Sequence, residues 1–179
     1  MKKLLLLLCF VFIHQVVYPV YFKHLGMSDG LSQVSVMSIY QDCLGRMWFG
    51  TREGVSIYDG ERMRVYKGWE NLDPESSINV LLGHECDHLT GNRQGDIFFR
   101  TCDSLVRYDI REEKFCVVSG CKAKTITSAD GDIWTGYDDM VCRYDEKGDS
   151  LQLYAKTNTP GISSLLISGK KIWIGTDEG

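Results

Sequence analysis

The sequence predicts an all-β protein built from about three and a half copies of a four-stranded antiparallel unit. An aromatic residue between two turn segments recurs four times, at Trp48, Phe98, Trp134 and Trp173. The spacings centre on about 40 residues, the period of one β-propeller blade. Glycine is frequent at 18 residues and proline rare at 3, which favours short strands joined by hairpins. The predicted fold is therefore a partial β-propeller, an incomplete ring.

Each copy of the repeat begins with a predicted turn. Glycine accepts a positive φ and aspartate hydrogen-bonds its own backbone, so the Asp/Gly segment before each aromatic residue favours a tight turn. We expect the aromatic residue on the next strand to fill the space between neighbouring blades and to be mostly buried. Three copies also carry a glycine two residues later, and these structural glycines are Gly50, Gly136 and Gly175.

The blades are expected in chain order, at about 34–66, 87–118 and 125–154, with a fourth begun over 163–179. In the first blade, Asp59-Gly60 is a strong hairpin signal between the third and fourth strands. A fourth blade that stops after two strands leaves uncovered blade faces and open strand edges. We therefore expect residues 20–179 to be the front part of a larger propeller, with further blades or another copy of the chain as partners.

The first copy of the repeat, residues 42–59, is DCLGRMWFGTREGVSIYD. It resembles the two-component regulator propeller repeat, and four spaced copies extend the resemblance over roughly residues 20 to 179. The second copy departs from the pattern at Phe98 and Arg100, which replace tryptophan and glycine. The third copy has Thr135-Gly136-Tyr137 in place of Ile-Gly-Thr.

In that family, the repeat builds the extracytoplasmic sensor of hybrid histidine kinase/response regulators. The resemblance implies a ligand-sensing, non-catalytic propeller located in the periplasm and attached to the inner membrane in the full-length protein. The kinase would belong to the parent protein, because the chain contains none of its residues. An oligosaccharide is the expected ligand, since the family is frequent in bacteria that digest polysaccharides.

Residues 1–19 predict export. Lys2 and Lys3 precede an apolar run from Leu4 to Ile13, the pattern of a secretory signal. This run is too short for a stop-transfer helix. Because no small-x-small cleavage site follows, a cleaved signal peptide and an uncleaved signal-anchor both remain open. Export would permit disulfides, and Cys116 with Cys121, which flank a predicted turn, are the best-placed pair.

The composition and motifs do not favour an enzyme or a nucleic-acid-binding protein. A net charge of −4 argues against a nucleic-acid surface. The segment from His84 to His88 matches H-E-x-x-H, but zinc-protease chemistry requires this motif on a helix. The repeat places it on a connection that enters the second blade, so we expect a solvated loop there. We predict no catalytic residue, metal ligand or cofactor.

Candidate ligand-binding residues come from the variable turns after each second strand, from that strand and from the long inter-blade connection. Standard strand order places these turns on one face of the disc, where propellers commonly bind partners. The candidates offer hydrogen-bonding and stacking groups, and they are Arg52, Trp69, Arg100 and Tyr137. Two alternatives remain open: a stand-alone interaction propeller assembled from two or more chains, and a propeller lyase or glycosidase.

Overall fold

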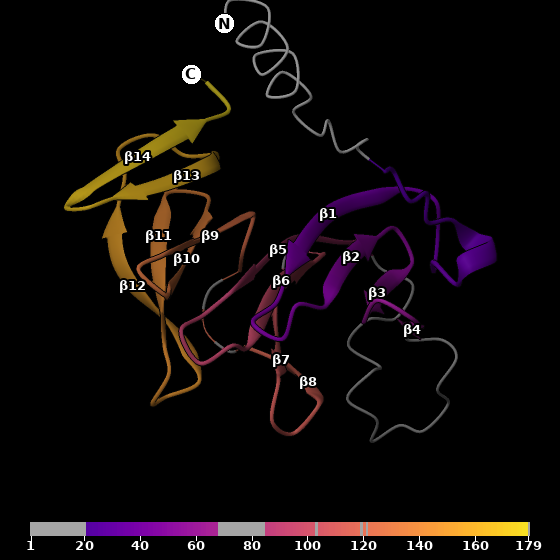
Figure 1. Cartoon of the computed structure of the whole chain (residues 1–179). Coiled ribbons are helices and arrows are strands. Elements are labelled where there is room, and N and C mark those ends of the chain that lie inside the picture. Colours follow the sequence, from indigo (N-terminus) through magenta and orange to yellow (C-terminus); the bar gives the residue numbers. More distant parts are fainter. Residues whose placement is uncertain (1–20, 68–84, 103, 119, 121, 179) are drawn as a thin grey trace, which may run out of the picture.

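The computed structural model of the chain describes residues 21–67, 85–102, 104–118, 120 and 122–178. These residues form three four-stranded antiparallel sheets and one two-stranded sheet, each built from consecutive strands. A 3-10 turn at Met27–Asp29 precedes them. The sheets follow one another along an open arc, from β1 to β14 in chain order (Figure 1). The predicted all-β class and partial propeller are thereby confirmed.

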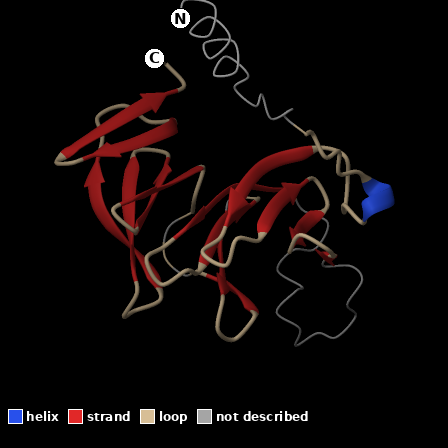
Figure 2. Ribbon diagram, in the orientation of Figure 1, coloured by secondary structure: helices blue, strands red, loops and turns tan. Residues whose placement is uncertain are grey.

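Each sheet is one blade, and Figure 2 shows the strands linked by short turns within it. The strand bounds are β1 Val36–Gln41, β2 Met47–Thr51, β3 Gly54–Tyr58 and β4 Met63–Tyr66 in blade 1; β5 Cys86–Gly91, β6 Ile97–Thr101, β7 Ser104–Asp109 and β8 Lys114–Val117 in blade 2; β9 Thr125–Ala129, β10 Asp132–Tyr137, β11 Met140–Asp145 and β12 Ser150–Lys156 in blade 3; and β13 Ile162–Ser168 and β14 Lys171–Thr176 in blade 4.

The hydrophobic core lies between successive blades. Trp48 of β2 and Phe98 of β6 are fully buried, and Trp134 of β10 is nearly so. The cluster around Trp48 joins blades 1 and 2, that around Phe98 joins blades 2 and 3, and that around Trp134 joins blade 3 to Ile162 and Leu165 of blade 4. Each blade therefore buries its apolar face against the next, as repeat proteins do.

Trp173 departs from the expected burial. It occupies the equivalent position on β14, yet 59% of its surface is exposed. Among the described residues, blade 4 contains only β13 and β14, and no following blade lies against them. The repeat sets the position of the side chain, but a neighbouring blade is needed to bury it.

Two of the repeat glycines permit close approach between blades. A Cβ atom on Gly50 would lie 2.4 Å from the carbonyl oxygen of Cys86, which is backbone of β5 in the next blade. A Cβ atom on Gly136 would lie 2.5 Å from Cγ2 of Ile162 in blade 4. Contacts this short would force the first strand of the next blade outward.

The Asp/Gly turn of blade 1 is a structural hydrogen-bonding centre. Asp42 accepts hydrogen bonds from the backbone N–H groups of Leu44 and Arg46, from Arg46 Nε at 2.7 Å and from Trp48 Nε1 at 2.8 Å. Burial by itself would raise the pKa of Asp42, but the hydrogen bonds from Trp48 and Arg46 outweigh it and lower the pKa below its usual value. The carboxylate fixes the indole that enters the inter-blade core.

Candidate functional site

One edge of the described sheets carries the turns between second and third strands and the connections between blades. Backbone hydrogen bonds tie these segments together: Lys124 N–H donates to Gly136 O at 2.8 Å, and Ile162 N–H donates to Asp138 O at 3.0 Å. Such bonds hold the turn after β10 against the connections before β9 and β13. We call this edge the turn face.

A shallow pocket of about 230 Å³ lies on the turn face between blades 3 and 4. It is lined by Lys124, Tyr137, Asp138 and Gly161. Lys124 Nζ is 2.7 Å from Asp177 Oδ2, an ion pair that links the edge of blade 3 to blade 4. An aromatic ring beside paired charges is typical of sites that bind polar ligands with an apolar face.

Lys122 places a second cation beside the Tyr137 ring of this pocket. Its Nζ atom lies 5.6 Å from the centroid of the Tyr137 ring, within cation–π range. Tyr137 is one of the residues predicted from the sequence, whereas Lys122 and Lys124 are not. The signal for both was the short Lys122-Ala123-Lys124 segment immediately before the first strand of blade 3.

Arg100 lies on β6 directly opposite Asp87 of β5. Its Nε donates to Asp87 Oδ1 at 2.8 Å, and a second nitrogen contacts Oδ2. His88 Nδ1 is 2.9 Å from the same carboxylate. Burial by itself would raise the pKa of Asp87, but Arg100 and His88 outweigh it and hold the pKa at about 2. The pair gives Arg100 a structural role besides the ligand-binding role expected for it.

Three of the four predicted ligand residues are described, and each belongs to a different blade. Arg52 lies in the turn after β2, and its Nε is 4.0 Å from Glu85 Oε2. Arg100 belongs to the second blade, and Tyr137 lines the pocket between blades 3 and 4. Trp69 lies outside the described residues.

The H-E-x-x-H segment lies partly outside the described residues, which exclude His84. His88 belongs to strand β5 and has a φ of 53° at a register shift, and Cys86 and Asp87 are buried in the same strand. This part of the motif is therefore strand, neither the helix that zinc-protease chemistry requires nor the solvated loop expected from the sequence. No group of three or more metal-ligating side chains occurs in the described residues. Cys116 is a free cysteine in the structure, and its expected partner Cys121 lies outside the described residues.

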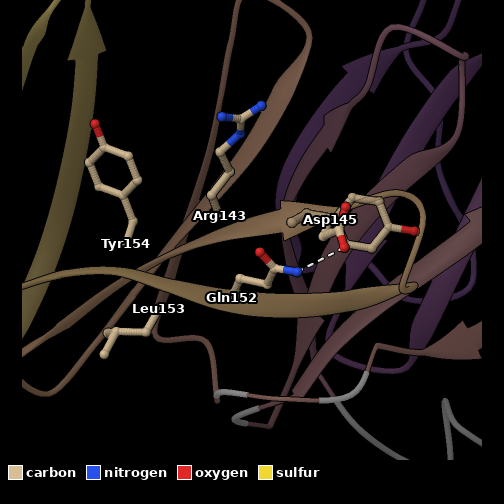
Figure 3. Close-up of a pocket in the computed structure, with 6 residues that line it drawn as sticks. Arg143, Asp145, Gln152, Leu153 and Tyr154 are labelled. Atoms are coloured by element: carbon tan, nitrogen blue, oxygen red, sulfur yellow. Dashed lines mark hydrogen bonds between the residues drawn. The ribbon is translucent and has the colours of Figure 1, made fainter.

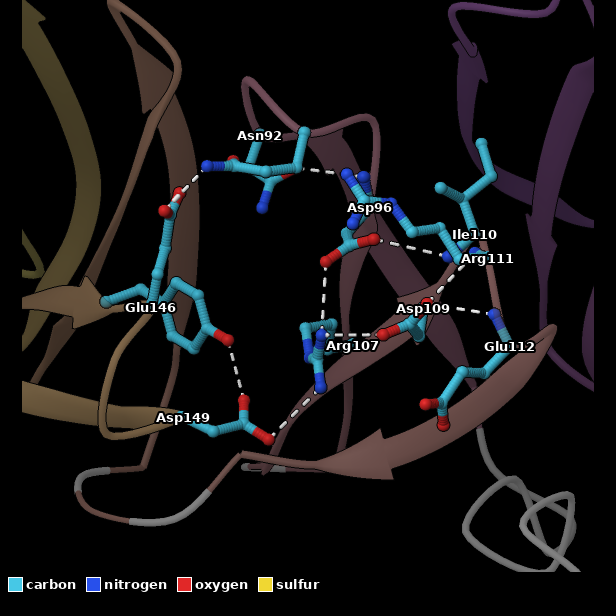
Figure 4. Close-up of polar contacts among 11 residues, drawn as sticks. Asn92, Asp96, Arg107, Asp109, Ile110, Arg111, Glu112, Glu146 and Asp149 are labelled. Atoms are coloured by element: carbon cyan, nitrogen blue, oxygen red, sulfur yellow. Dashed lines mark hydrogen bonds and ion pairs between the residues drawn. The ribbon is translucent and has the colours of Figure 1, made fainter.

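A polar network occupies the opposite edge of blades 2 and 3 (Figure 4). Arg107 of β7 contacts Asp96 at 3.1 Å, Asp109 at 3.2 Å and Asp149 of blade 3 at 3.1 Å. A pocket of about 190 Å³ lies over these groups. Three carboxylates around one guanidinium compensate its charge. We therefore assign the network to the joint between the blades.

The fold is similar to that of an extracellular domain of a two component system and to that of a lyase. It is similar to the extracellular domain of BT4673 from B. thetaiotaomicron, a protein assigned to the hybrid two component systems, with a TM-score of 0.67 and 17% identity over 86% of this chain and 21% of that chain. It is also similar to virginiamycin B lyase from Staphylococcus aureus, with a TM-score of 0.57 and 16% identity over 81% of this chain and 50% of that chain. At these identities the likeness shows the fold alone.

A sequence relative is also a two-component protein, a histidine kinase. Over 59 residues the chain is 41% identical to histidine kinase P4 of Formosa agariphila. The resemblance to two-component sensors is confirmed. The match covers 33% of this chain and 4% of the kinase, so the chain spans a small part of its relative. No model of a known protein family matches the chain.

The described part of residues 21–178 contains no helix with the length and apolar character needed to cross a bilayer. The export signal expected over residues 1–19 lies outside the described residues.

Proposed function

We propose that the chain is part of an extracytoplasmic, non-catalytic sensor propeller of a two-component regulator, and that its turn face binds an oligosaccharide. The observation that carries the proposal is the Tyr137 pocket, on a fold similar to that of the extracellular domain of a hybrid two component system. In the full-length protein, the sensor would lie in the periplasm and be attached to the inner membrane.

The chemistry of the pocket suits a sugar. The Tyr137 ring offers an apolar surface and a hydroxyl group, while Lys122, Lys124 and Asp138 supply hydrogen-bond donors and an acceptor around it. Asp138 and Asp177 balance the charges of Lys122 and Lys124, so a sugar carboxylate gains most by replacing Asp177 on Lys124, a contact that a neutral sugar cannot make as strongly. A uronic-acid oligosaccharide is therefore the first ligand to test.

The pocket lies between two blades, so binding of a ligand there could change how the blades are positioned relative to each other. The Lys124–Asp177 ion pair joins one wall of the pocket to blade 4. A ligand that competes for Lys124 would alter this contact, and it would shift the relative position of the blades if it favours one arrangement over another. The uncovered face of blade 4 would be covered by further blades or by another copy of the chain.

The test is calorimetric titration of the full chain with a panel of neutral and uronic-acid oligosaccharides. We expect binding of at least one acidic oligosaccharide, and a loss of affinity of about tenfold in Tyr137→Ala and in Lys124→Gln. Tyr21→Ala is the control, because that exposed tyrosine lies in the segment before the first blade.

Binding that survives both pocket substitutions would contradict the assignment of the site, and binding of none of the panel would contradict the ligand class. Incubation of the same sugars with the chain and analysis of the products separates a sensor from an enzyme. Cleavage would favour a propeller lyase or glycosidase.

A further inference from the structure

The two complete boundaries between blades share one pair of contacts. At the first, Trp48 stacks edge-on against Tyr108 at 4.9 Å, and Arg64 reaches Glu113 at 3.7 Å. At the second, Phe98 stacks edge-on against Tyr144 at 4.8 Å, and Arg107 reaches Asp149 at 3.1 Å (Figure 4). In both cases the earlier blade supplies the aromatic ring and the arginine. The later blade supplies a tyrosine and a carboxylate.

The two contributions of the later blade have a fixed spacing. Tyr108 is followed after five residues by Glu113, and Tyr144 after five residues by Asp149. Both tyrosines lie on the third strand of their blade. Both acids end the turn before the fourth strand with a positive φ, 51° for Glu113 and 45° for Asp149. We call this unit the tyrosine–acid hairpin.

The face of blade 3 contains the receiving half of the same contact. Trp134 is equivalent to Trp48 and Phe98, and Arg143 lies directly opposite Trp134 on β11. The guanidinium lies 5.8 Å from the centroid of the indole and pairs with Asp132 of the same blade at 3.2 Å. Blade 4 covers Trp134 through β13, but no described residue supplies the tyrosine and acid of a hairpin to this face.

The surface left open is a groove of about 250 Å³ (Figure 3). Arg143, Gln152 and Tyr154 line it, and Leu153 and Tyr154 are each more than half exposed. Figure 3 shows Gln152 turned toward Asp145, to which its Nε2 donates at 2.8 Å. The groove thus combines an exposed apolar strip with a guanidinium that is half accessible to solvent.

We propose that this groove is the docking site for a tyrosine–acid hairpin, a two-stranded β-hairpin that carries a tyrosine on its first strand and a carboxylate five residues later. Its first strand pairs with β14, which has one partner strand among the described residues. The tyrosine packs against Trp134 in place of Tyr154, whose mostly exposed ring stacks edge-on against the indole at 4.8 Å between centroids, and the carboxylate reaches Arg143. The two complete boundaries provide the template for both contacts.

A second copy of the chain does not supply this hairpin. Its blade 2 and blade 3 hairpins are already engaged by Trp48 and Phe98. Its blade 1 hairpin has Tyr58 on the third strand, but the residue five positions later is Met63, which already belongs to the fourth strand. The blade 1 turn is therefore two residues too short to present an acid, because Tyr58 pairs directly with Met63 whereas Tyr108 pairs with Phe115.

The test is to append a copy of residues 139–157, the blade 3 hairpin with its flanking turns, after Gly179 of the full chain. We expect the melting temperature to rise by about 5 °C or more, since each kcal/mol of added stability shifts the midpoint by several degrees. The matched control carries Tyr144→Thr and Asp149→Asn in the appended copy only. It retains the strands that pair with β14, and we expect it to lose most of the rise.

A second pair of variants addresses the groove itself. Arg143→Gln should remove at least half of the rise in the fused chain, while Arg62→Gln, an exposed position in blade 1, should leave the rise unchanged. An equal rise with both appended hairpins, no rise at all, or no effect of Arg143→Gln would each overturn the proposal. A rise that increases with protein concentration would also overturn it, because it would place another molecule in the groove.

Discussion

Trp48 and Trp173 occupy the same place in the repeat, yet one is fully buried and the other is mostly exposed. Trp48 is enclosed by blade 2, where Tyr108 stacks on its indole, and Asp42 accepts a hydrogen bond from its Nε1. Trp173 has none of these neighbours among the described residues. The difference teaches that the sequence repeat specifies the strand and the face of a side chain, whereas its burial depends on the next blade.

The largest expected effect tests this comparison directly. Trp48→Ala should lower the free energy of unfolding by about 3–5 kcal/mol, because it removes a fully buried indole and leaves a cavity between two blades. Trp173→Ala should lower it by less than about 1 kcal/mol, because most of that indole already contacts solvent. Urea unfolding followed by far-ultraviolet circular dichroism measures both. Equal losses would show that blade 4 is buried in solution and would break the comparison.

The same comparison extends to the arginines of β7 and β11. Arg107 is 17% exposed and contacts three carboxylates, whereas Arg143 is 49% exposed and contacts one. Arg107→Gln should cost about 2 kcal/mol of unfolding free energy, because it leaves the carboxylates near one another without a cation. Arg143→Gln should cost less than about 1 kcal/mol. A larger loss in Arg143→Gln than in Arg107→Gln would contradict this order.

Gly50 and Gly175 give a smaller contrast at one repeat position. A Cβ atom on Gly50 meets backbone of the next blade, which cannot rotate away, while a Cβ atom on Gly175 meets the Ser164 hydroxyl, which can. We expect Gly50→Ala to cost about 1–2 kcal/mol through overpacking and Gly175→Ala to be nearly neutral. Thermal melts of the two variants measure these stability differences. An unchanged melting temperature in Gly50→Ala would mean that β5 can move away from β2.

The sequence was sufficient to predict the all-β class and the partial propeller, because the aromatic residues and turns recur with one period. It could not predict which aromatic residue would be exposed, since burial depends on what packs against the outer face of blade 4. It also identified single ligand candidates but not the pocket, because Lys124 and Tyr137 are brought together by a backbone hydrogen bond from the connection before β9 to Gly136 of β10.

The arginine contacts have a signal in the sequence. Arg107 and Arg143 both precede the Tyr-Asp end of the third strand in their repeats, at Arg107-Tyr108-Asp109 and Arg143-Tyr144-Asp145. In blade 1 the equivalent residue is Ile57, which cannot form an ion pair. Arg64, directly opposite Ile57 on β4, contacts the acid of the next blade instead. The arginine has moved from the third strand to the paired position on the fourth, so comparing the third strands alone does not reveal it.

The smallest expected effect concerns the second blade, where Arg100 replaces the repeat glycine and pairs with Asp87. The folded-state pKa of Asp87 is about 2, below its ordinary value of 3.8. A lowered pKa in the folded state stabilises the fold fully above the unfolded pKa, and this contribution disappears as the pH falls from about 4 to about 2. Arg100→Gln removes the main counter-charge, so the pKa of Asp87 should rise and the contribution should be lost at a higher pH.

We therefore expect Arg100→Gln to lower the free energy of unfolding by about 1 kcal/mol at pH 7 and by much less at pH 2.5, where Asp87 of the variant is protonated in both states. Arg52→Gln is the matched control, because its contact with Glu85 is 4.0 Å long and exposed, and it should be near neutral at both pH values. Urea titrations at the two pH values measure the differences. If Arg100→Gln costs the same at pH 2.5 as at pH 7, the arginine stabilises blade 2 by packing rather than by its charge.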